Sequence, residues 1–321
     1  MSSLSRKLRS LKRRYRFNRR THPSPTTLVW WGSFRDGGGA TIGDLHAVNN
    51  LSAALSQAGI EHDVLSHPAL GIAGHRQVAD LFDVRPEIKT LAFVCGPIVD
   101  SGELIDLLTV HRNARRLAVG VSVIARHRDV ARRFDTILAR DGVAEPAFDL
   151  AIASVRPCMP PAGKRLKAAI CFRGSQSDYG AGNTEWEKAE RLLSQLAGTD
   201  PVAIDTVMRP GNDAGRIERQ FEDADIVLTT RLHGSLYGLA KGKPVIAIDQ
   251  IKGTGKVKPL LDRIGWPFAY SIEEADKALL ADATRRIRAE WPVGAVAKAQ
   301  RAILELSAKA RTDSVGLIGR G

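Results

Sequence analysis

Short apolar runs alternate with segments of helical periodicity along this chain, and the alternation restarts after a proline-rich segment. The first series contains TLVWW, LAFVC and LAVGVSV, at Thr27–Trp31, Leu91–Cys95 and Leu117–Val123. The second series contains AAICF at Ala168–Phe172 and PVIAI at Pro244–Ile248. Apolar strands that alternate with helices favour parallel sheets covered on both faces. The sequence therefore predicts an α/β protein of two Rossmann-like, doubly wound domains.

The boundary between the two series is predicted within residues 155–165, VRPCMPPAGKR, because three prolines interrupt the pattern there. We expect a basic leader and linker over residues 1–25, an N-terminal domain over 26–155 and a C-terminal domain over 156–321. Residues 281–311 are expected to form closing helices, some of them packing on the first domain. Two local signals complete this picture: a strand at Leu150–Ala153, and a capping box of Thr184 and Glu187 at the start of a helix.

Positive charge is concentrated at the N-terminus. The net charge is +12, and nine of the 47 Lys and Arg lie in the first 20 residues, so the remainder carries 12 − 9, or +3. A mildly basic body argues against a nucleic-acid partner. In the leader, Leu4, Leu8, Leu11 and Tyr15 share one helical face. The leader is therefore a contact to an anionic membrane surface, a solvated tail or a contact to nucleic acid.

The cysteines and the hydropathy pattern indicate the compartment. Cys95, Cys158 and Cys171 are widely spaced, which argues against a disulfide framework and favours a reducing environment. No apolar run approaches the ~20 residues that span a bilayer, and no apolar secretory segment follows the basic leader. We expect a cytoplasmic protein, peripheral at the inner face of the membrane where the leader binds lipid. The histidines show no metal-ligand spacing, so no metal is expected.

The segment TTRLHGS, Thr229–Ser235, carries the clearest chemical signal, because it lies where an apolar strand ends and a helix begins. Ligands of open α/β sheets bind at this edge. Arg231 offers a planar fork for a carboxylate or phosphate, and His233 can exchange protons near neutral pH. Gly234 would let a ligand approach the backbone, and the first N–H groups of the helix would add to an anion site that includes Ser235.

Three further cations follow strands of the second domain. Arg173 ends the first of these strands and is expected to face the same ligand as Arg231. Lys252 and Lys256 follow a later strand, where they either hold phosphate or are solvated loop cations. The run GTGK that ends at Lys256 lacks the other residues of a P-loop, so nucleotide hydrolysis is not expected.

In the first domain, a Gly-rich loop from Gly32 to Gly43 joins a strand to a helix, without the G-x-G-x-x-G spacing. A helix N-terminus after such a loop is a natural anion site. Asp44, at the start of that helix, either contacts a ligand or complements the helix dipole.

The chain resembles the polysaccharide pyruvyl transferase family at TTRLHGSLYGLAKGKPVIAID, residues 229–249. The likeness continues at Lys256 and at LDRIG, Leu261–Gly265, and weaker agreement over residues 27–265 includes Gly43-Asp44 and Arg140-Asp141. Two places depart from the family. Thr41 stands where the family usually has Asn, and Cys95-Gly96-Pro97 stands where it usually has a run of glycines.

The resemblance implies a glycosyltransferase-B-like fold with two domains facing a cleft. It implies transfer of pyruvate from phosphoenolpyruvate, the donor substrate, to a sugar of a polysaccharide or its lipid-linked precursor as a ketal, with no further cofactor. Catalysis is then expected at His233 and Arg231, and acceptor binding at Gly43 and Asp44. The expected donor-binding residues are Arg173, Arg231, Gly234, Ser235, Lys252 and Lys256.

Two other functions remain open. A glycosyltransferase that uses a nucleotide sugar would have the same fold but would need an acidic residue for the donor ribose, for which Asp249 is the best candidate. A non-catalytic binding protein would fit the altered Cys95-Gly96-Pro97 run, whereas the intact Arg231 and His233 argue for an enzyme.

Overall fold

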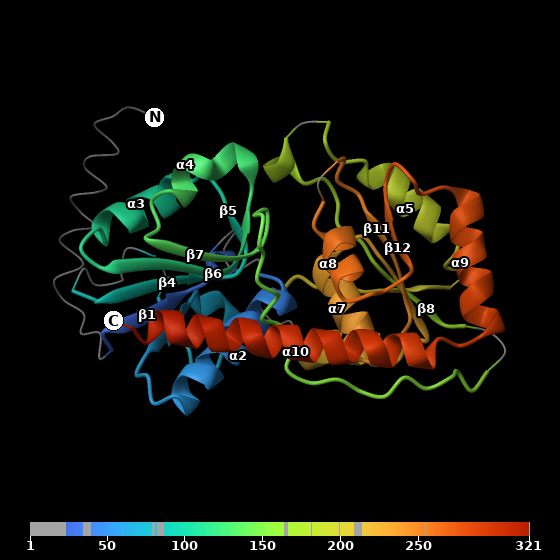
Figure 1. Cartoon of the computed structure of the whole chain (residues 1–321), viewed down its shortest axis with the longest axis horizontal. Coiled ribbons are helices and arrows are strands. Elements are labelled where there is room, and N and C mark those ends of the chain that lie inside the picture. Colours follow the sequence, from blue (N-terminus) through green and yellow to red (C-terminus); the bar gives the residue numbers. More distant parts are fainter. Residues whose placement is uncertain are drawn as a thin grey trace. The chain divides into compact units, whose positions relative to one another are not determined.

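The computed structural model describes residues 24–34, 40–78, 81, 87–163, 166–180, 182–198, 200–208, 214–253 and 255–320. The basic leader of residues 1–20 lies outside these residues. The chain forms two compact units, each built on one parallel sheet with helices beside it (Figure 1). The first unit comprises Met1–Leu150, Val207–Gly211 and Lys309–Gly321, and the second comprises Ala151–Thr206 and Asn212–Ala308.

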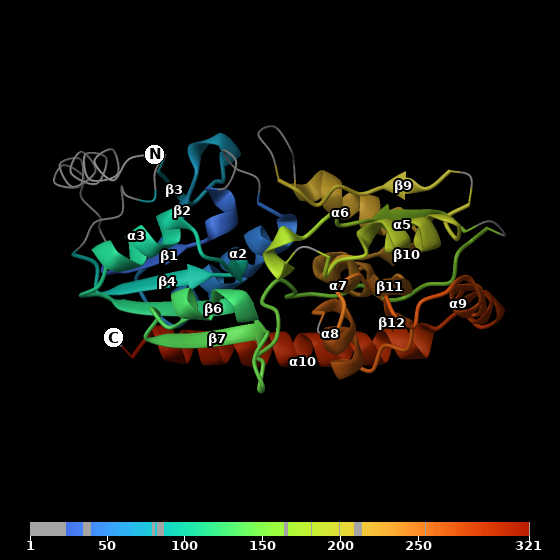
Figure 2. The ribbon, with the colours of Figure 1, turned by 90° about the horizontal axis from the view of Figure 1, so that it is seen from above.

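The sheet of the first unit has the strand order β3-β2-β1-β4-β6-β5, with β7 also paired to β6. All of these pairings are parallel, and Figure 2 shows β4, β6 and β7 side by side. The order reverses direction between β1 and β4, the point at which doubly wound sheets bind ligands. The strands are β1 (Thr26–Val29), β2 (Asp63–Ser66), β3 (Arg76–Gln77), β4 (Thr90–Val94), β5 (Pro97–Ile98), β6 (Arg115–Val123) and β7 (Thr136–Asp141).

The helices of this unit bury the apolar positions that recur at helical spacing. In α2 (Ile42–Gln57), Leu45, Val48, Leu51 and Leu55 are all buried. The other helices are α3 (Gly102–Val110), α4 (Arg128–Ala131) and the short 3₁₀ turns η1 (Trp31–Ser33), η3 (Pro68–Leu70) and η5 (Ala125–His127). The core lies between α3, α4 and the sheet and contains Phe93, Leu104 and Phe134.

The sheet of the second unit is parallel, with the order β12-β11-β10-β8-β9, and reverses direction between β8 and β10. Its strands are β8 (Ala168–Cys171), β9 (Val202–Ala203), β10 (Ile226–Thr229), β11 (Val245–Asp249) and β12 (Ala269–Ser271). Nearly every residue of β10 and β11 is inaccessible to solvent, as expected for strands covered on both faces. The two doubly wound units confirm the predicted fold class.

Helices cover both faces of the second sheet, with α5 and α9 on one side and α7 and α8 on the other (Figure 1). All nine residues of α7 are buried, so this helix is covered on every side. The helices are α5 (Trp186–Ser194), α6 (Ala214–Glu222), α7 (Leu232–Ala240), α8 (Val257–Arg263), α9 (Lys277–Ala289) and α10 (Val293–Ile318), with the 3₁₀ turn η6 (Ser177–Tyr179).

The boundary between the units differs from the prediction. The first unit ends at Leu150 rather than at residue 155, and the last part of α10 also belongs to it. The proline-rich segment packs within the second unit, because the Arg156 N–H donates to the Ala240 carbonyl (2.7 Å) and the Gln300 side chain donates to the Arg156 carbonyl (2.7 Å). It is therefore a packed segment of the second unit.

Two local predictions were wrong. The segment Leu150–Ala153 forms no strand, although Leu150, Ala151 and Ile152 are buried. Thr184 does not cap α5, since Glu185 is the N-cap residue and makes no side-chain capping bond. The Thr184 hydroxyl instead accepts a hydrogen bond from the Gln250 amide (3.2 Å), and Thr184 forms an antiparallel bridge with Ile251. Tertiary contacts between two loops therefore replace the predicted local cap.

Candidate functional site

Two threonines join the carboxyl ends of β8 and β10, where the strand order of the second sheet reverses. Thr229 Oγ1 donates to the Cys171 carbonyl (2.6 Å) and accepts from the Arg231 N–H (3.0 Å). Thr230 Oγ1 accepts from the Arg173 N–H (2.8 Å). These bonds fix the main chain of both arginines at one edge of the sheet. The prediction that Arg173 and Arg231 face the same ligand stays a prediction, although their main chains lie at the same edge of the sheet.

The Arg231 side chain is anchored at the same edge. Its Nε donates to the Phe172 carbonyl (2.5 Å), and the residue is only half-buried. Within the described part of the chain, no carboxylate lies within ion-pair distance of the guanidinium. A guanidinium held through Nε keeps its two terminal nitrogens for a carboxylate or phosphate.

Helix α7 starts at this edge, with Arg231 as its N-cap residue. The Arg231 side chain makes no capping bond to the first turn of the helix. Together with the guanidinium, this end of the helix suits an anion. His233, the second residue of α7, is only 8% exposed, and its proposed proton-exchange role stays a prediction.

Gly234 and Ser235 have packing roles in α7. A Cβ atom at Gly234 would lie 2.4 Å from Thr229 Oγ1 and 3.1 Å from Cys171 Sγ, so glycine lets the helix pack against the strand ends. The fully buried Ser235 hydroxyl donates to the Arg231 carbonyl (3.1 Å) within the helix. The packing partners of both residues are protein atoms, and their expected contact with the donor stays a prediction.

The two lysines after β11 differ in their surroundings. The Lys252 ammonium forms an exposed ion pair with Glu185 (2.7 Å), which lowers the pKa of the Glu185 carboxyl. The Lys256 ammonium lies 5.5 Å from the centre of the Tyr179 ring, within cation–π range. Lys252 would have to leave its carboxylate partner Glu185 to hold phosphate.

Asp249, which we expected to bind the ribose of a nucleotide-sugar donor, makes hydrogen bonds within the protein. Its carboxylate accepts hydrogen bonds from the backbone N–H groups of Val257 (2.7 Å), Lys258 (3.1 Å) and Ile251 (3.3 Å). The side chain is buried, and burial raises its pKa against the opposing effect of these bonds. Gly255 passes so close that any side chain there would collide with this carboxyl. Asp249 therefore holds the start of α8 and the loop before it.

Glu190 was not predicted from the sequence, although it lies beside the candidate site. It sits half-buried on α5, next to the buried Ala189, and interacts electrostatically with Arg231. Burial raises the pKa of the Glu190 carboxyl, and the Arg231 charge works in the opposite direction. Glu190 is thus an acidic group of the second unit within electrostatic reach of the anion site.

In the first unit, Asp44 caps helix α2. Its Oδ2 accepts from the Thr41 N–H (3.2 Å) and the Thr41 hydroxyl (2.7 Å), while Thr41 Oγ1 accepts from the Asp44 N–H (3.3 Å). The Thr41 departure from the family is therefore conservative, since Thr and Asn both cap helices. Gly43 is buried in the first turn. The geometry gives Asp44 the capping role, and acceptor binding by Gly43 and Asp44 stays a prediction.

The turn after β4 has the backbone conformation that favours glycine. Cys95 has a φ of 50° and Gly96 a φ of 75°, so both residues adopt the left-handed conformation that favours glycine. A residue other than glycine is strained in this conformation. Burial, and next the charge of Asp44, raise the pKa of the Cys95 thiol, so it is a poor nucleophile.

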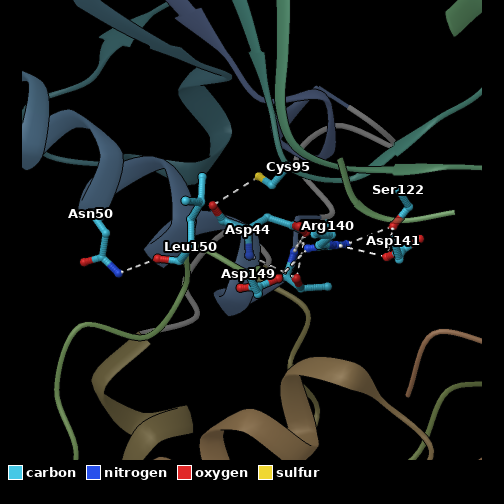
Figure 3. A network of polar contacts seen from close by, with 9 residues as sticks. Asp44, Asn50, Cys95, Ser122, Arg140, Asp141, Asp149 and Leu150 are labelled. Carbon is cyan, nitrogen blue, oxygen red and sulfur yellow. Dashed lines mark hydrogen bonds and ion pairs between the residues drawn. The ribbon is translucent and has the colours of Figure 1, made fainter. Parts of the chain in front are cut away.

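A buried arginine organises the carboxyl edge of the first sheet (Figure 3). The Arg140 guanidinium pairs with Asp149 (2.8 Å) and Asp141 (3.5 Å), and its Nη2 donates to Ser122 Oγ (3.4 Å). Burial disfavours the charge, but the two carboxylates outweigh it and raise the pKa of Arg140. Arg140 therefore stays charged at every working pH.

The described residues contain no helix long and apolar enough to cross a membrane, and no group of three His, Cys, Asp or Glu side chains that could hold a metal. A cavity of about 420 Å³ lies at the amino ends of β8 and β10, lined by Leu196, Ile226 and Arg288 among others. It opens at the edge opposite Arg231, so it is separate from the candidate site.

No family model and no curated protein matches the chain. Among solved structures, the glycosyltransferase VinC in complex with dTDP has a TM-score of 0.50 at 13% identity, over 92% of this chain and 98% of that chain. The glycotransferase of kitacinnamycin has a TM-score of 0.48 at 11% identity, over 92% and 98%. UDP-GlcNAc 2-epimerase from Methanocaldococcus jannaschii has a TM-score of 0.46 at 8% identity, over 88% and 99%.

The fold is that of GT-B glycosyltransferases. At 13% identity the likeness to VinC concerns the fold alone, and function has to be argued from the residues at the site.

Proposed function

We propose that this protein is a transferase that moves a group from an anionic donor to a hydroxyl of a carbohydrate, and that the donor is phosphoenolpyruvate. The observation that supports it is the pair Arg173 and Arg231, held by Thr229 and Thr230 at the reversal point of the second sheet. Phosphoenolpyruvate carries a carboxylate and a phosphate, and its binding needs preorganised cations and N–H groups.

The proposed reaction consumes two hydroxyls and releases phosphate. A proton adds to the methylene carbon of the donor, and one hydroxyl oxygen bonds to the neighbouring carbon. Loss of phosphate and attack by the second hydroxyl then complete the ketal. The two hydroxyl groups of the sugar lose one proton each. One of these protons replaces the proton that was added to the methylene carbon, and the other is released with phosphate. His233 is the proposed proton donor, and such a group contributes about 10²–10⁴-fold in rate.

A second candidate is glycosyl transfer from a nucleotide sugar. The likeness to a glycosyltransferase in complex with dTDP favours it, at a TM-score of 0.50. This candidate needs an acidic group for the ribose, and Asp249 is occupied by three backbone N–H groups. If the donor is a nucleotide sugar, we assign the ribose contact to Glu190, which interacts electrostatically with Arg231.

A titration of the full chain separates the two donors. We expect phosphoenolpyruvate to bind and Arg231→Lys to weaken binding at least tenfold, about 1.4 kcal/mol. Glu190→Gln should not weaken it, because this change removes a negative charge near the anion site. The exposed Arg191→Lys on α5 is the matched control. Binding of UDP- or dTDP-sugars that is lost in Glu190→Gln would favour glycosyl transfer instead. If neither donor class binds, the transferase proposal is wrong.

A further inference from the structure

The carboxyl edge of the first sheet places two carboxylates on one buried cation, Arg140. A buried guanidinium needs a well-placed carboxylate. Asp149, fully buried and 2.8 Å from Nη1, supplies it. Asp141 is a second carboxylate on the same cation, at the longer distance of 3.5 Å, and its side chain is 17% exposed.

The position of Asp141 is fixed by its neighbours on β6 and β7. Ser122 lies directly opposite Asp141 in the parallel register, and its hydroxyl donates to Asp141 Oδ2 (2.8 Å). The same hydroxyl accepts from Arg140 Nη2 (3.4 Å), so its proton is directed at the carboxylate. The next residue, Gly142, has a φ of 78°, and a Cβ there would lie 1.8 Å from the Val123 carbonyl oxygen. A tight turn thus holds Asp141 at the end of its strand.

These bonds use one oxygen of the carboxylate. Both the Ser122 hydroxyl and the Arg140 Nε approach Oδ2, and within the described residues no hydrogen bond reaches Oδ1. Figure 3 shows Asp141 on the side of Arg140 away from Asp149 and Asp44. Asp44, the acid predicted to bind the acceptor, is already occupied by the cap of α2.

We propose that Asp141 is the residue of the first unit that binds a hydroxyl of the acceptor sugar, with Ser122 and Arg140 as positioning residues. The inference rests on the proposed function, because it assigns the acceptor of that transferase. Carboxylates are strong acceptors for hydroxyl groups, and this one is fixed at the edge where doubly wound sheets bind ligands.

The test measures sugar binding without a donor. The full chain is applied to a printed array of neutral and acidic oligosaccharides, beside Asp141→Asn, Ser122→Ala and Asp129→Asn. Asp129 is the matched control, because its side chain is 95% exposed and it lies in the same unit. We expect Asp141→Asn to lower binding at least tenfold, about 1.4 kcal/mol, Ser122→Ala to lower it less, and Asp129→Asn to match the wild type.

Wild-type binding by Asp141→Asn, or binding of no arrayed sugar by the wild type, would overturn the inference. Should Asp141→Asn unfold, Ser122→Ala decides, since a folded Ser122→Ala with unchanged binding also contradicts it. The donor titration above is independent of this array. If sugar binding depends on Asp141 but phosphoenolpyruvate does not bind, the proposed donor is wrong and the role of Asp141 is supported.

Discussion

Replacing Gly234 with alanine would place a methyl group against the carboxyl ends of β8 and β10. The new Cβ would lie 2.4 Å from Thr229 Oγ1, 3.1 Å from Cys171 Sγ and 3.3 Å from Arg231 Cβ. Comfortable carbon contacts are about 3.5–4.0 Å, so the start of α7 has to move by roughly 1 Å. Thr229 cannot give way easily, because its hydroxyl is bonded to Cys171 and to Arg231.

The expected cost combines two opposing effects. Overpacking costs about 1–3 kcal/mol, and the higher helix propensity of alanine returns about 1 kcal/mol. We therefore expect Gly234→Ala to lower the free energy of unfolding by up to roughly 2 kcal/mol. Because Arg231 and the first turn of α7 shift together, donor affinity should fall at least tenfold, in line with the ~100-fold cost of a 1 Å misplacement in a site.

Gly238→Ala is the matched control on the same helix. Its Cβ would lie 2.6 Å from Val245 Cγ2 and 3.2 Å from Val227 Cβ, so it overpacks in a similar way, one turn from the strand ends. Urea unfolding and calorimetric titration with phosphoenolpyruvate measure both variants. We expect similar losses of stability but near wild-type donor affinity for Gly238→Ala. Equal donor affinity in the two variants would refute the placement of the donor at the start of α7.

Three further predictions concern the arginine, the histidine and the leader. Arg231→Lys should lower the kcat/KM for phosphoenolpyruvate at least tenfold, about 1.4 kcal/mol, because lysine cannot copy a bidentate contact; unchanged steady-state kinetics would remove Arg231 from the site. His233→Ala should lower turnover ~100-fold or more while leaving the fold intact, whereas equal losses of stability and activity would indicate a packing role. The full chain should co-sediment with anionic vesicles, and a chain starting at Thr21 should not. Salt should weaken this binding in part, because charges are screened beyond about 8 Å. Equal sedimentation of both chains would make residues 1–20 a solvated tail.

The sequence predicted those elements whose own residues specify them. The apolar runs at β4, β6, β8 and β11 are buried on both faces, so composition alone marked them as strands. The edge strands β3 and β12 have two and three residues, too few for a pattern, and exist because a neighbouring strand pairs with them. Leu150, Ala151 and Ile152 are apolar and buried, although they join no sheet.

The candidate site was predictable only in part. Arg173 and Arg231 each follow an apolar run, and parallel strands bring such positions to one edge. The sequence could not show whether Asp44 and Asp249 bind a ligand or hold the start of a helix, because both roles use the same residue types. Asp141 owes its position to the register between β6 and β7 and to a buried arginine, and neither leaves a local sequence pattern.

Phosphate release from phosphoenolpyruvate, measured across a panel of polymer and lipid-linked sugars, tests the central claim most directly. The full chain should release phosphate only when a suitable sugar is present, with one pyruvate ketal formed for each phosphate, and Arg231→Lys should slow the release at least tenfold. Transfer from a nucleotide sugar to the same acceptors, with no release from phosphoenolpyruvate, would contradict the account.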